Sequence, residues 1–233
     1  MSLSIQQSTD FLASSVIFSN LRKNKNGGKS VYLNGPNSRK IQLEIPKMRA
    51  PFGLGTFTDE ASKKITYSLD LSFDAEPEIA NFMNKMKELD DLIIKTVAEN
   101  SVEWLGKKYG IPVIKEALYK PLVKPGKGEY PGTIKLKVLQ DAKTGNFQAE
   151  AYNYQRENVE LTSIEKGQRV KCLITIAQIW FIDNKFGVSV RLEQVLLEPS
   201  KKLPRFAFQN VDPPPATDDA EEEGEEEFEV DEN

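Results

Sequence analysis

The pattern of apolar and polar residues predicts strands towards both ends of the chain and one long helix between them. Apolar residues alternate with polar ones at 41–45 and most clearly at 65–73, as expected of half-buried strands. Further runs follow at 134–138, 147–151 and 169–197, with a turn at 183–185. These runs and the shorter ones near the N-terminus indicate about eight strands.

The period changes after Pro77, where apolar residues recur at intervals of three and four. This spacing predicts an amphipathic helix, and a proline suits its first turn. The helical signal continues to Gly110, which is placed to end the helix, and Pro112 blocks its continuation. The predicted buried face of this helix consists of Ile79, Phe82, Met86, Leu89, Ile93 and Val97.

These elements predict a mainly β protein, an OB-fold-like antiparallel barrel with a long α-helix inserted between the third and fourth strands. A β-sandwich stays open as an alternative, because periodicity does not distinguish a closed barrel from two stacked sheets. We expect one domain over residues 1–211, with the helical insert at about 77–110. Residues 212–233 are expected to form a disordered acidic tail, since they offer little apolar surface to bury.

Charge changes this picture, because the formal net charge of -4 is the sum of two opposite parts. Residues 212–233 contain twelve acidic residues and no basic one, which leaves a net charge of +8 on the preceding body. Residues 11–58 contribute +7 and residues 107–137 contribute +6, whereas residues 59–106 contribute -6. A basic body with an acidic tail points to polyanion binding and an interaction tail.

Composition also excludes several classes of protein. The absence of histidine removes imidazole catalysis and Cys/His zinc sites. The single cysteine, Cys172, excludes an intramolecular disulfide and fits a reducing, intracellular compartment. We see no secretory signal and no apolar run long enough to span a bilayer. The carboxylates Asp70, Asp74, Glu76 and Glu78 are explained by a strand end and a helix start, so neither an enzyme nor a cofactor or metal is expected.

Aromatic residues accompany the basic segments, and this combination is typical of proteins that bind single-stranded nucleic acid. Cations meet the phosphates while bases stack on the rings, at roughly 1–3 kcal/mol per base. We rate Phe181 and Tyr67 as core residues. The candidate nucleic-acid-binding residues are Arg22, Lys23, Tyr32, Arg39, Lys40, Lys47, Arg49, Phe52, Lys135, Lys137, Tyr152, Tyr154, Arg156, Trp180 and Lys185.

The layout resembles a known family. The basic OB-type body, the loop at 46–53, the hairpin at 180–197 and an acidic tail holding Phe228 resemble the replicative single-stranded DNA-binding proteins of podovirus-type phages. The layout is more similar still to their counterparts in large nucleocytoplasmic DNA viruses. In the phage family the tail ends at an aromatic residue. Here five residues follow Phe228, so recognition of a terminal aromatic is not carried over.

This resemblance implies a protein that protects single-stranded DNA in viral replication and recombination, at the replication site in the cytoplasm or nucleus. It also implies recruitment of polymerase, helicase or primase through the tail residues Glu221, Glu222, Glu223, Glu225, Glu226, Glu227 and Phe228. Independently, a -12 tail tethered to a basic groove would compete for that groove, and a homodimer could form by tail exchange. An acidic-tailed chaperone for histones or other basic proteins, a single-stranded RNA-binding protein and a carboxylate-metal nuclease stay open as alternatives.

Overall fold

The computed structural model describes residues 5–23, 27–199 and Phe208. The predicted acidic tail, with all seven of its candidate partner-binding residues, lies outside these described residues. The described part is mainly β, with one mixed sheet and one long helix. It therefore confirms the predicted class, whereas the extent of the predicted domain over residues 1–211 stays a prediction.

Short strands dominate the first third of the chain and two long strands dominate the last. The short early strands are β1 (Gln6–Gln7), β2 (Ile17–Phe18), β3 (Arg22–Lys23), β4 (Lys29–Asn34), β5 (Ile41–Glu44), β6 (Met48–Ala50), β7 (Leu54–Thr58) and β8 (Ile65–Ser72). The later strands are β9 (Tyr119–Lys120), β10 (Thr133–Val138), β11 (Glu150–Tyr152), β12 (Asn158–Val159), β13 (Gln168–Ile182) and β14 (Lys185–Leu197). The helices are α1 (Pro77–Glu99), α2 (Ser101–Leu105) and α3 (Ile111–Val113), which continues into a wide turn at Ile114–Leu118.

Five strands pair in a circuit that returns to its start. β13 pairs with β6, β6 with β8, β8 with β10, β10 with β14, and β14 again with β13. All of these pairs are antiparallel except β10 with β14. The long strand β13 also pairs with β4 and β5, so it joins the N-terminal strands to the circuit.

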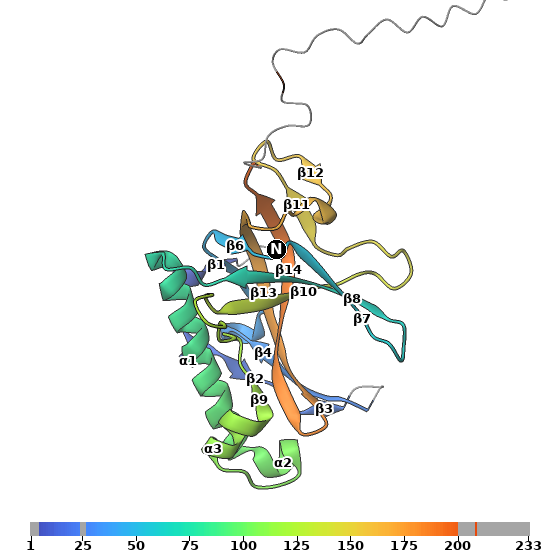
Figure 1. Cartoon of the computed structure of the whole chain (residues 1–233). Coiled ribbons are helices and arrows are strands. Elements are labelled where there is room, and N and C mark those ends of the chain that lie inside the picture. Colours follow the sequence, from blue (N-terminus) through green and yellow to red (C-terminus); the bar gives the residue numbers. More distant parts are fainter. Residues whose placement is uncertain (1–4, 24–26, 200–207, 209–233) are drawn as a thin grey trace, which may run out of the picture. The chain divides into compact units, whose positions relative to one another are not determined.

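The helix α1 lies along one side of the sheet, and the β7–β8 hairpin projects on the other (Figure 1). The buried face of α1 contains the six apolar residues predicted from the sequence. In chain order through the five-strand circuit, α1 falls between the second strand, β8, and the third, β10. Our placement between the third and fourth strands was therefore wrong, because alternation does not reveal which of several short strands take part in the circuit.

The helical segment also ends earlier than predicted. α1 stops at Glu99, and α2 stops where Gly106 adopts a left-handed conformation with φ +81. The Gly106 N–H then donates to the carbonyl of Val102, as is common at helix C-termini. Gly110 has an extended conformation and precedes α3, so the predicted helix end at Gly110 was wrong.

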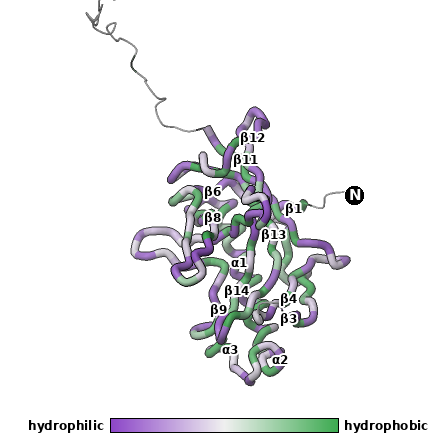
Figure 2. Tube along the Cα trace, turned by 90° about the vertical axis from the view of Figure 1, so that its right-hand side faces the viewer, coloured by the Kyte–Doolittle hydropathy of each residue, from purple (hydrophilic) through white to green (hydrophobic). Residues whose placement is uncertain are grey.

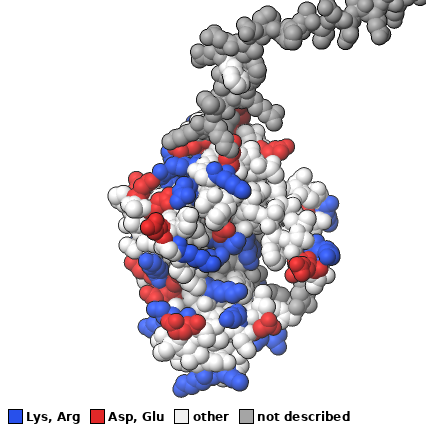
Figure 3. All heavy atoms as spheres, viewed as in Figure 1, with Lys and Arg blue, Asp and Glu red and all other residues white. Residues whose placement is uncertain are grey.

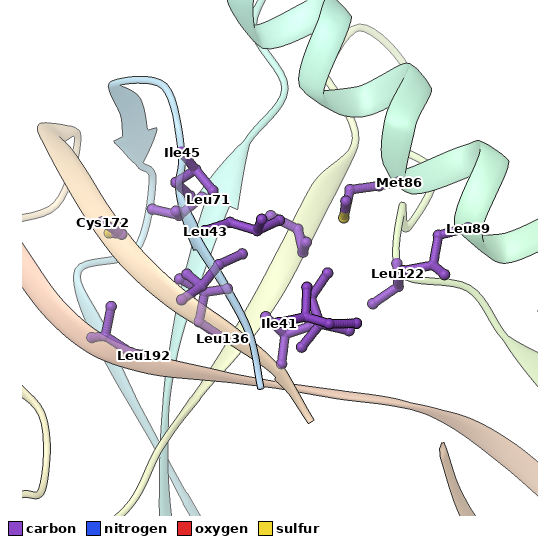
Figure 4. Packing of buried hydrophobic residues seen from close by; sticks show 14 of the residues in the cluster. Ile41, Leu43, Ile45, Leu71, Met86, Leu89, Leu122, Leu136, Cys172 and Leu192 are labelled. Carbon is purple, nitrogen blue, oxygen red and sulfur yellow. The ribbon is translucent and has the colours of Figure 1, made fainter. Parts of the chain in front are cut away.

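The core fills the space between α1 and the strands. Met86 and Leu89 of α1 point towards strand residues such as Leu43, Leu71 and Leu136 (Figure 4). Hydrophobic and hydrophilic residues alternate along the strands (Figure 2), which matches the period-two pattern of the sequence. This alternation leaves the polar side chains of β8, β10 and β14 on an outer face.

Candidate nucleic-acid interface

Strand β10 places two lysines on the outer face of the sheet. Lys135 and Lys137 are exposed, while the alternate residues Ile134 and Leu136 are fully buried. Lys137 is the register partner of Arg191 on the parallel neighbour β14. Because paired residues in a ladder project to the same face, the two cations stand beside each other.

The Lys137 ammonium contacts the sheet surface, although part of the side chain is exposed to solvent. It donates to the buried hydroxyl of Ser189 at 2.9 Å. Partial burial of the ammonium lowers the pKa of Lys137, and the positive charge of the neighbouring Arg191 lowers it further. None of the ion pairs among the described residues involves Lys137 or Arg191. Their mutual repulsion is therefore not relieved by a carboxylate and favours the approach of an external anion.

Three further lysines extend this pair of cations. Lys135 donates to Ser68 and forms an ion pair with Asp70, both at 3.1 Å. The backbone of Lys124 forms an isolated antiparallel β-bridge with Thr133. Burial of the Lys124 ammonium, and then the positive charge of Lys135, lower the pKa of Lys124. We call Lys120, Lys124, Lys135, Lys137 and Arg191 the basic strip. Figure 3 shows Lys and Arg side chains gathered along the middle of one face of the molecule.

A row of register partners joins the basic strip to Trp180. Lys120 of β9 pairs with Gly187 of β14, which pairs with Trp180 of β13. The Lys120 ammonium lies over the indole ring, 5.6 Å from its centroid, within cation–π range. A Cβ at Gly187 would lie only 2.9 Å from Cζ2 of Trp180. Glycine at this position therefore lets the half-buried indole lie over β14 beside Lys120.

The same row continues to the predicted residues of the first hairpin. Trp180 pairs with Ser30 of β4, and Ser30 pairs with Arg22 of β3. The Arg22 guanidinium lies 5.2 Å from the centroid of the exposed Tyr32 ring. The two predicted aromatics Trp180 and Tyr32 and the cations Lys120 and Arg22 are thus brought together along a row of five strands, and the exposed Lys23 adjoins them on β3.

A groove of about 730 Å³ lies at the other side of the basic strip. Lys135 and Lys137 line it together with Phe57 and Tyr67 of the β7–β8 hairpin. Phe57 is 66% exposed, whereas Tyr67 is half-buried and packs edge-on against Phe147 with ring centroids 4.9 Å apart. The strip is therefore flanked by aromatic rings on both sides, Trp180 on one and Phe57 on the other.

Other predicted residues lie apart from this strip or are engaged by carboxylates. Lys47 forms an ion pair with Glu198, and Arg49 donates two hydrogen bonds to Asp74, at 2.9 and 3.1 Å. The hydrogen bonds from Arg49 hold the pKa of Asp74 below its ordinary value. These two cations have a structural use already, so they are weaker candidates for phosphate contacts than the strip.

The remaining predicted residues are distributed over loops and a sheet edge. The Lys185 ammonium donates to the carbonyl of Ala117, so it lies at the β13–β14 turn near β9. Tyr152 on β11 donates to Glu150. Tyr154 has an exposed ring and lies next to Lys47. The other four residues occupy turns or loops: Arg39, Lys40, Phe52 and Arg156.

The sequence prediction missed four residues that the structure places in or beside the basic strip: Lys120, Lys124, Gly187 and Arg191. Arg191 has the outward parity of Ser189 and Glu193 on β14, so alternation could have identified it. Lys120 and Lys124 lie in a connector without periodicity, and no local pattern marks which of its lysines face the groove. The need for glycine at position 187 can be recognised only from its cross-strand partner, Trp180.

The carboxylates Asp74 and Glu76 accept hydrogen bonds from Arg49 and Arg169. Over residues 5–23 and 27–199, no group of three or more acidic or cysteine side chains is arranged to hold a metal ion. No helix in the described part of the chain is long and apolar enough to cross a membrane. Cys172 is buried in β13, and this burial raises the pKa of its thiol.

Fold and surface together define a mainly β protein with an aromatic-flanked basic face. Residues 63–211 match DUF5871, a family of unknown function, and the chain belongs to this family. It is similar to the uncharacterized protein L291 of Acanthamoeba polyphaga mimivirus, with 26% identity over 163 residues, or 67% of this chain. The match covers 26% of L291, so the chain spans about a quarter of that relative's length.

Solved structures with partial similarity include two phage proteins. One is gp2.5, a single-stranded DNA-binding protein of bacteriophage T7, with a TM-score of 0.46, 15% identity, and coverage of 72% of this chain and 98% of gp2.5. Another is the single-stranded DNA-binding protein of bacteriophage Enc34 in complex with single-stranded DNA, with a TM-score of 0.41, 14% identity, and coverage of 80% and 97%. At these TM-scores the alignments establish neither the fold nor the function of this chain.

Proposed function

We propose that this chain is a sequence-nonspecific single-stranded DNA-binding protein that protects and organises single strands during viral DNA replication and recombination. The observation that carries the proposal is the basic strip, in which crowded cations, Lys137 and Arg191 without a carboxylate partner among the described residues, lie between Trp180 and Phe57. Crowded cations favour a polyanion, and rings beside them favour a polyanion whose bases are free to stack.

The geometry favours single strands over duplex DNA. Phe57 lines the groove beside Lys135 and Lys137, and Trp180 lies over β14 beside Lys120, so both rings face a sheet surface where unpaired bases can stack on them. Sequence-specific duplex readers instead place a helix or a β-ribbon in the major groove and read base edges through polar side chains. The long helix α1 is unsuited to this purpose, because it lies in residues 59–106, which carry a net charge of -6 and would be repelled by the phosphates of a duplex. Single-stranded RNA offers the same phosphates and bases, so its binding is an outcome of the test below.

We infer further that the five-strand circuit is a barrel of the OB type. Antiparallel pairs closed by one parallel pair, here β10 with β14, support this inference. In this fold the face of the second and third strands binds oligonucleotides. β8 and β10 hold these positions in the circuit, and the basic strip crosses β10.

The acidic segment from Asp212 to Asn233 completes the proposal. Twelve carboxylates tethered to the body would compete with DNA for the basic strip at high effective concentration. DNA would displace them, and the displaced segment would be available to basic surfaces of a polymerase, helicase or primase. Deletion of this segment should tighten single-stranded DNA binding and steepen its salt dependence. Unchanged affinity at low salt would contradict the competition.

The proposed function is tested by titrating the full chain with labelled oligonucleotides. We expect a thymidine oligonucleotide to bind more tightly than a duplex of equal length at every salt concentration. If all five cations of the basic strip contact phosphates, the slope of log K against log salt should approach about -3.5 for single strands. Equal affinity for both forms would favour a general polyanion binder, and preference for RNA or for core histones would favour those alternatives.

A further inference from the structure

Asp90 is a buried acidic residue on the apolar side of α1. It is 7% exposed and lies one helical turn after Met86 and next to Leu89, both of which are fully buried. Burial raises the pKa of Asp90 to about 6, even though several donors face its carboxylate. An ionised group in such a place opposes folding unless its partners compensate for its desolvation. Its contacts therefore indicate what it does.

All three hydrogen bonds to Asp90 come from one segment of the chain. The Tyr119 hydroxyl donates to Oδ1 at 2.5 Å, and the Leu122 N–H donates to the same oxygen at 3.1 Å. The Val123 N–H donates to Oδ2 at 3.5 Å. Two of the three donors are backbone groups of a connector that has no sheet partner at those positions. Asp90 thus ties the connector after β9 to the helix.

This tied segment carries two cations of the basic strip. Lys120 follows Tyr119 on β9, which pairs with Phe186 and Gly187 of β14. The Tyr119 ring also packs on Phe186, with ring centroids 5.1 Å apart. Lys124 follows Val123 directly and bridges to Thr133. Asp90 therefore holds the Tyr119 side chain next to Lys120 and the backbone of Leu122 and Val123 next to Lys124.

We propose that Asp90 is a positioning residue of the nucleic-acid interface, which holds segment 119–124 so that Lys120 lies beside Trp180 and Lys124 beside Lys135. This inference rests on the proposed function for its ligand, a single strand with regularly spaced phosphates. It assigns α1 a role in binding although the helix presents no cation to the groove. Without Asp90, the two lysines remain in the chain but lose their fixed distance from the other three.

The proposal is tested by Asp90→Ala in the full chain, with Ser101→Ala as the matched control. Ser101 is also buried, and its hydroxyl donates to the Ala98 carbonyl and accepts from the Tyr109 N–H, away from the basic strip. Asp90→Ala should weaken single-stranded DNA binding about tenfold and reduce the salt slope by about 1.4, the share of two phosphates. Ser101→Ala should leave the slope unchanged. A folded Asp90→Ala protein with the wild-type slope and affinity would overturn the inference.

Tyr119→Phe provides a milder variant in case Asp90→Ala does not fold. It removes one donor and keeps the ring on Phe186, so a reduction in slope of smaller size is expected. Amide hydrogen exchange separates this inference from the proposed function. If the wild-type chain fails to bind single strands, the proposed function fails. Faster exchange at 119–124 in either variant would still support the positioning role of Asp90, and unchanged exchange in both would refute it.

Discussion

The substitution Gly187→Ala provides the most direct test of how Trp180 is presented. A methyl group at this position would lie 2.9 Å from Cζ2 and 3.2 Å from Cε2 of the indole, and 3.0 Å from the Lys120 carbonyl oxygen. The indole cannot stay in place at the shortest of these distances, and the backbone oxygen of β9 has little freedom to move. We therefore expect the Trp180 ring to be displaced from β14 and from the Lys120 ammonium.

The size of the effect follows from what the ring contributes. Overpacking of this kind costs about 1–3 kcal/mol of folding stability. Loss of one stacked base costs about 1–3 kcal/mol of binding, which corresponds to roughly a 5- to 150-fold weaker affinity. The salt slope should stay unchanged, because no cation of the basic strip is removed. A change in affinity without a change in slope distinguishes loss of stacking from loss of a phosphate contact.

Tryptophan fluorescence supplies the assay. The chain has two tryptophans, and Trp104 is buried against Phe181, so Trp104→Phe leaves Trp180 as the only reporter. In this background, a thymidine oligonucleotide should quench Trp180 emission, and Gly187→Ala should reduce both the quenching and the affinity. Gly110→Ala is the control, since its added methyl would lie at an ordinary 3.7 Å from Pro112. Wild-type affinity and quenching in Gly187→Ala would refute the reasoning.

Three further substitutions test the remaining parts of the structure. Lys137→Gln should weaken binding more than Lys135→Gln and lower the slope by about 0.7, because Asp70 already neutralises Lys135; equal effects in a salt titration would contradict this. Arg49→Met should lower the free energy of unfolding by about 1 kcal/mol, and with it the melting temperature, because the partly exposed ion pair with Asp74 is lost. A changed salt slope would show that Arg49 also contacts DNA. Asp90→Asn should be more stable than wild type at pH 8, by up to about 3 kcal/mol, because the pKa of Asp90 rises from 3.8 to about 6 on folding. This advantage should shrink as the pH falls through 6 in denaturation experiments at pH 5 and 8, since the folded wild-type protein then gains its proton; a constant difference would exclude titration of Asp90.

Local periodicity predicted the elements that bury one face. The apolar stripe of α1 and the outward parity of Lys135 and Lys137 follow from spacing alone, and the structure has both. The position of α1 in the strand circuit could not be predicted in this way. Strand pairing is decided by contacts between distant segments, and short strands such as β5 and β6 have the same pattern whether or not they help close the circuit.

The predicted site shows the same division between local and distant information. Lys47 and Arg49 occupy a basic loop in the sequence, yet the fold brings Glu198 to the first and Asp74 to the second. The Glu198 partner lies 151 residues away along the chain, beyond the reach of any charge count over a window. The sequence thus located the cations but not their counter-ions.

Whether a cation already has a carboxylate partner therefore identifies the candidate interface better than the local number of cations does. A cation that already donates to a carboxylate gains little from a phosphate, because one ion pair replaces another. A cation crowded by other cations gains the relief of that repulsion as well as the new contact. Lys124 and Lys137 have pKa values lowered by burial and by neighbouring cations, and both belong to the basic strip. Their ammonium groups are held in a repulsive arrangement that a phosphodiester backbone would stabilise, and this repulsion is the physical reason to expect single strands to cross β10 there.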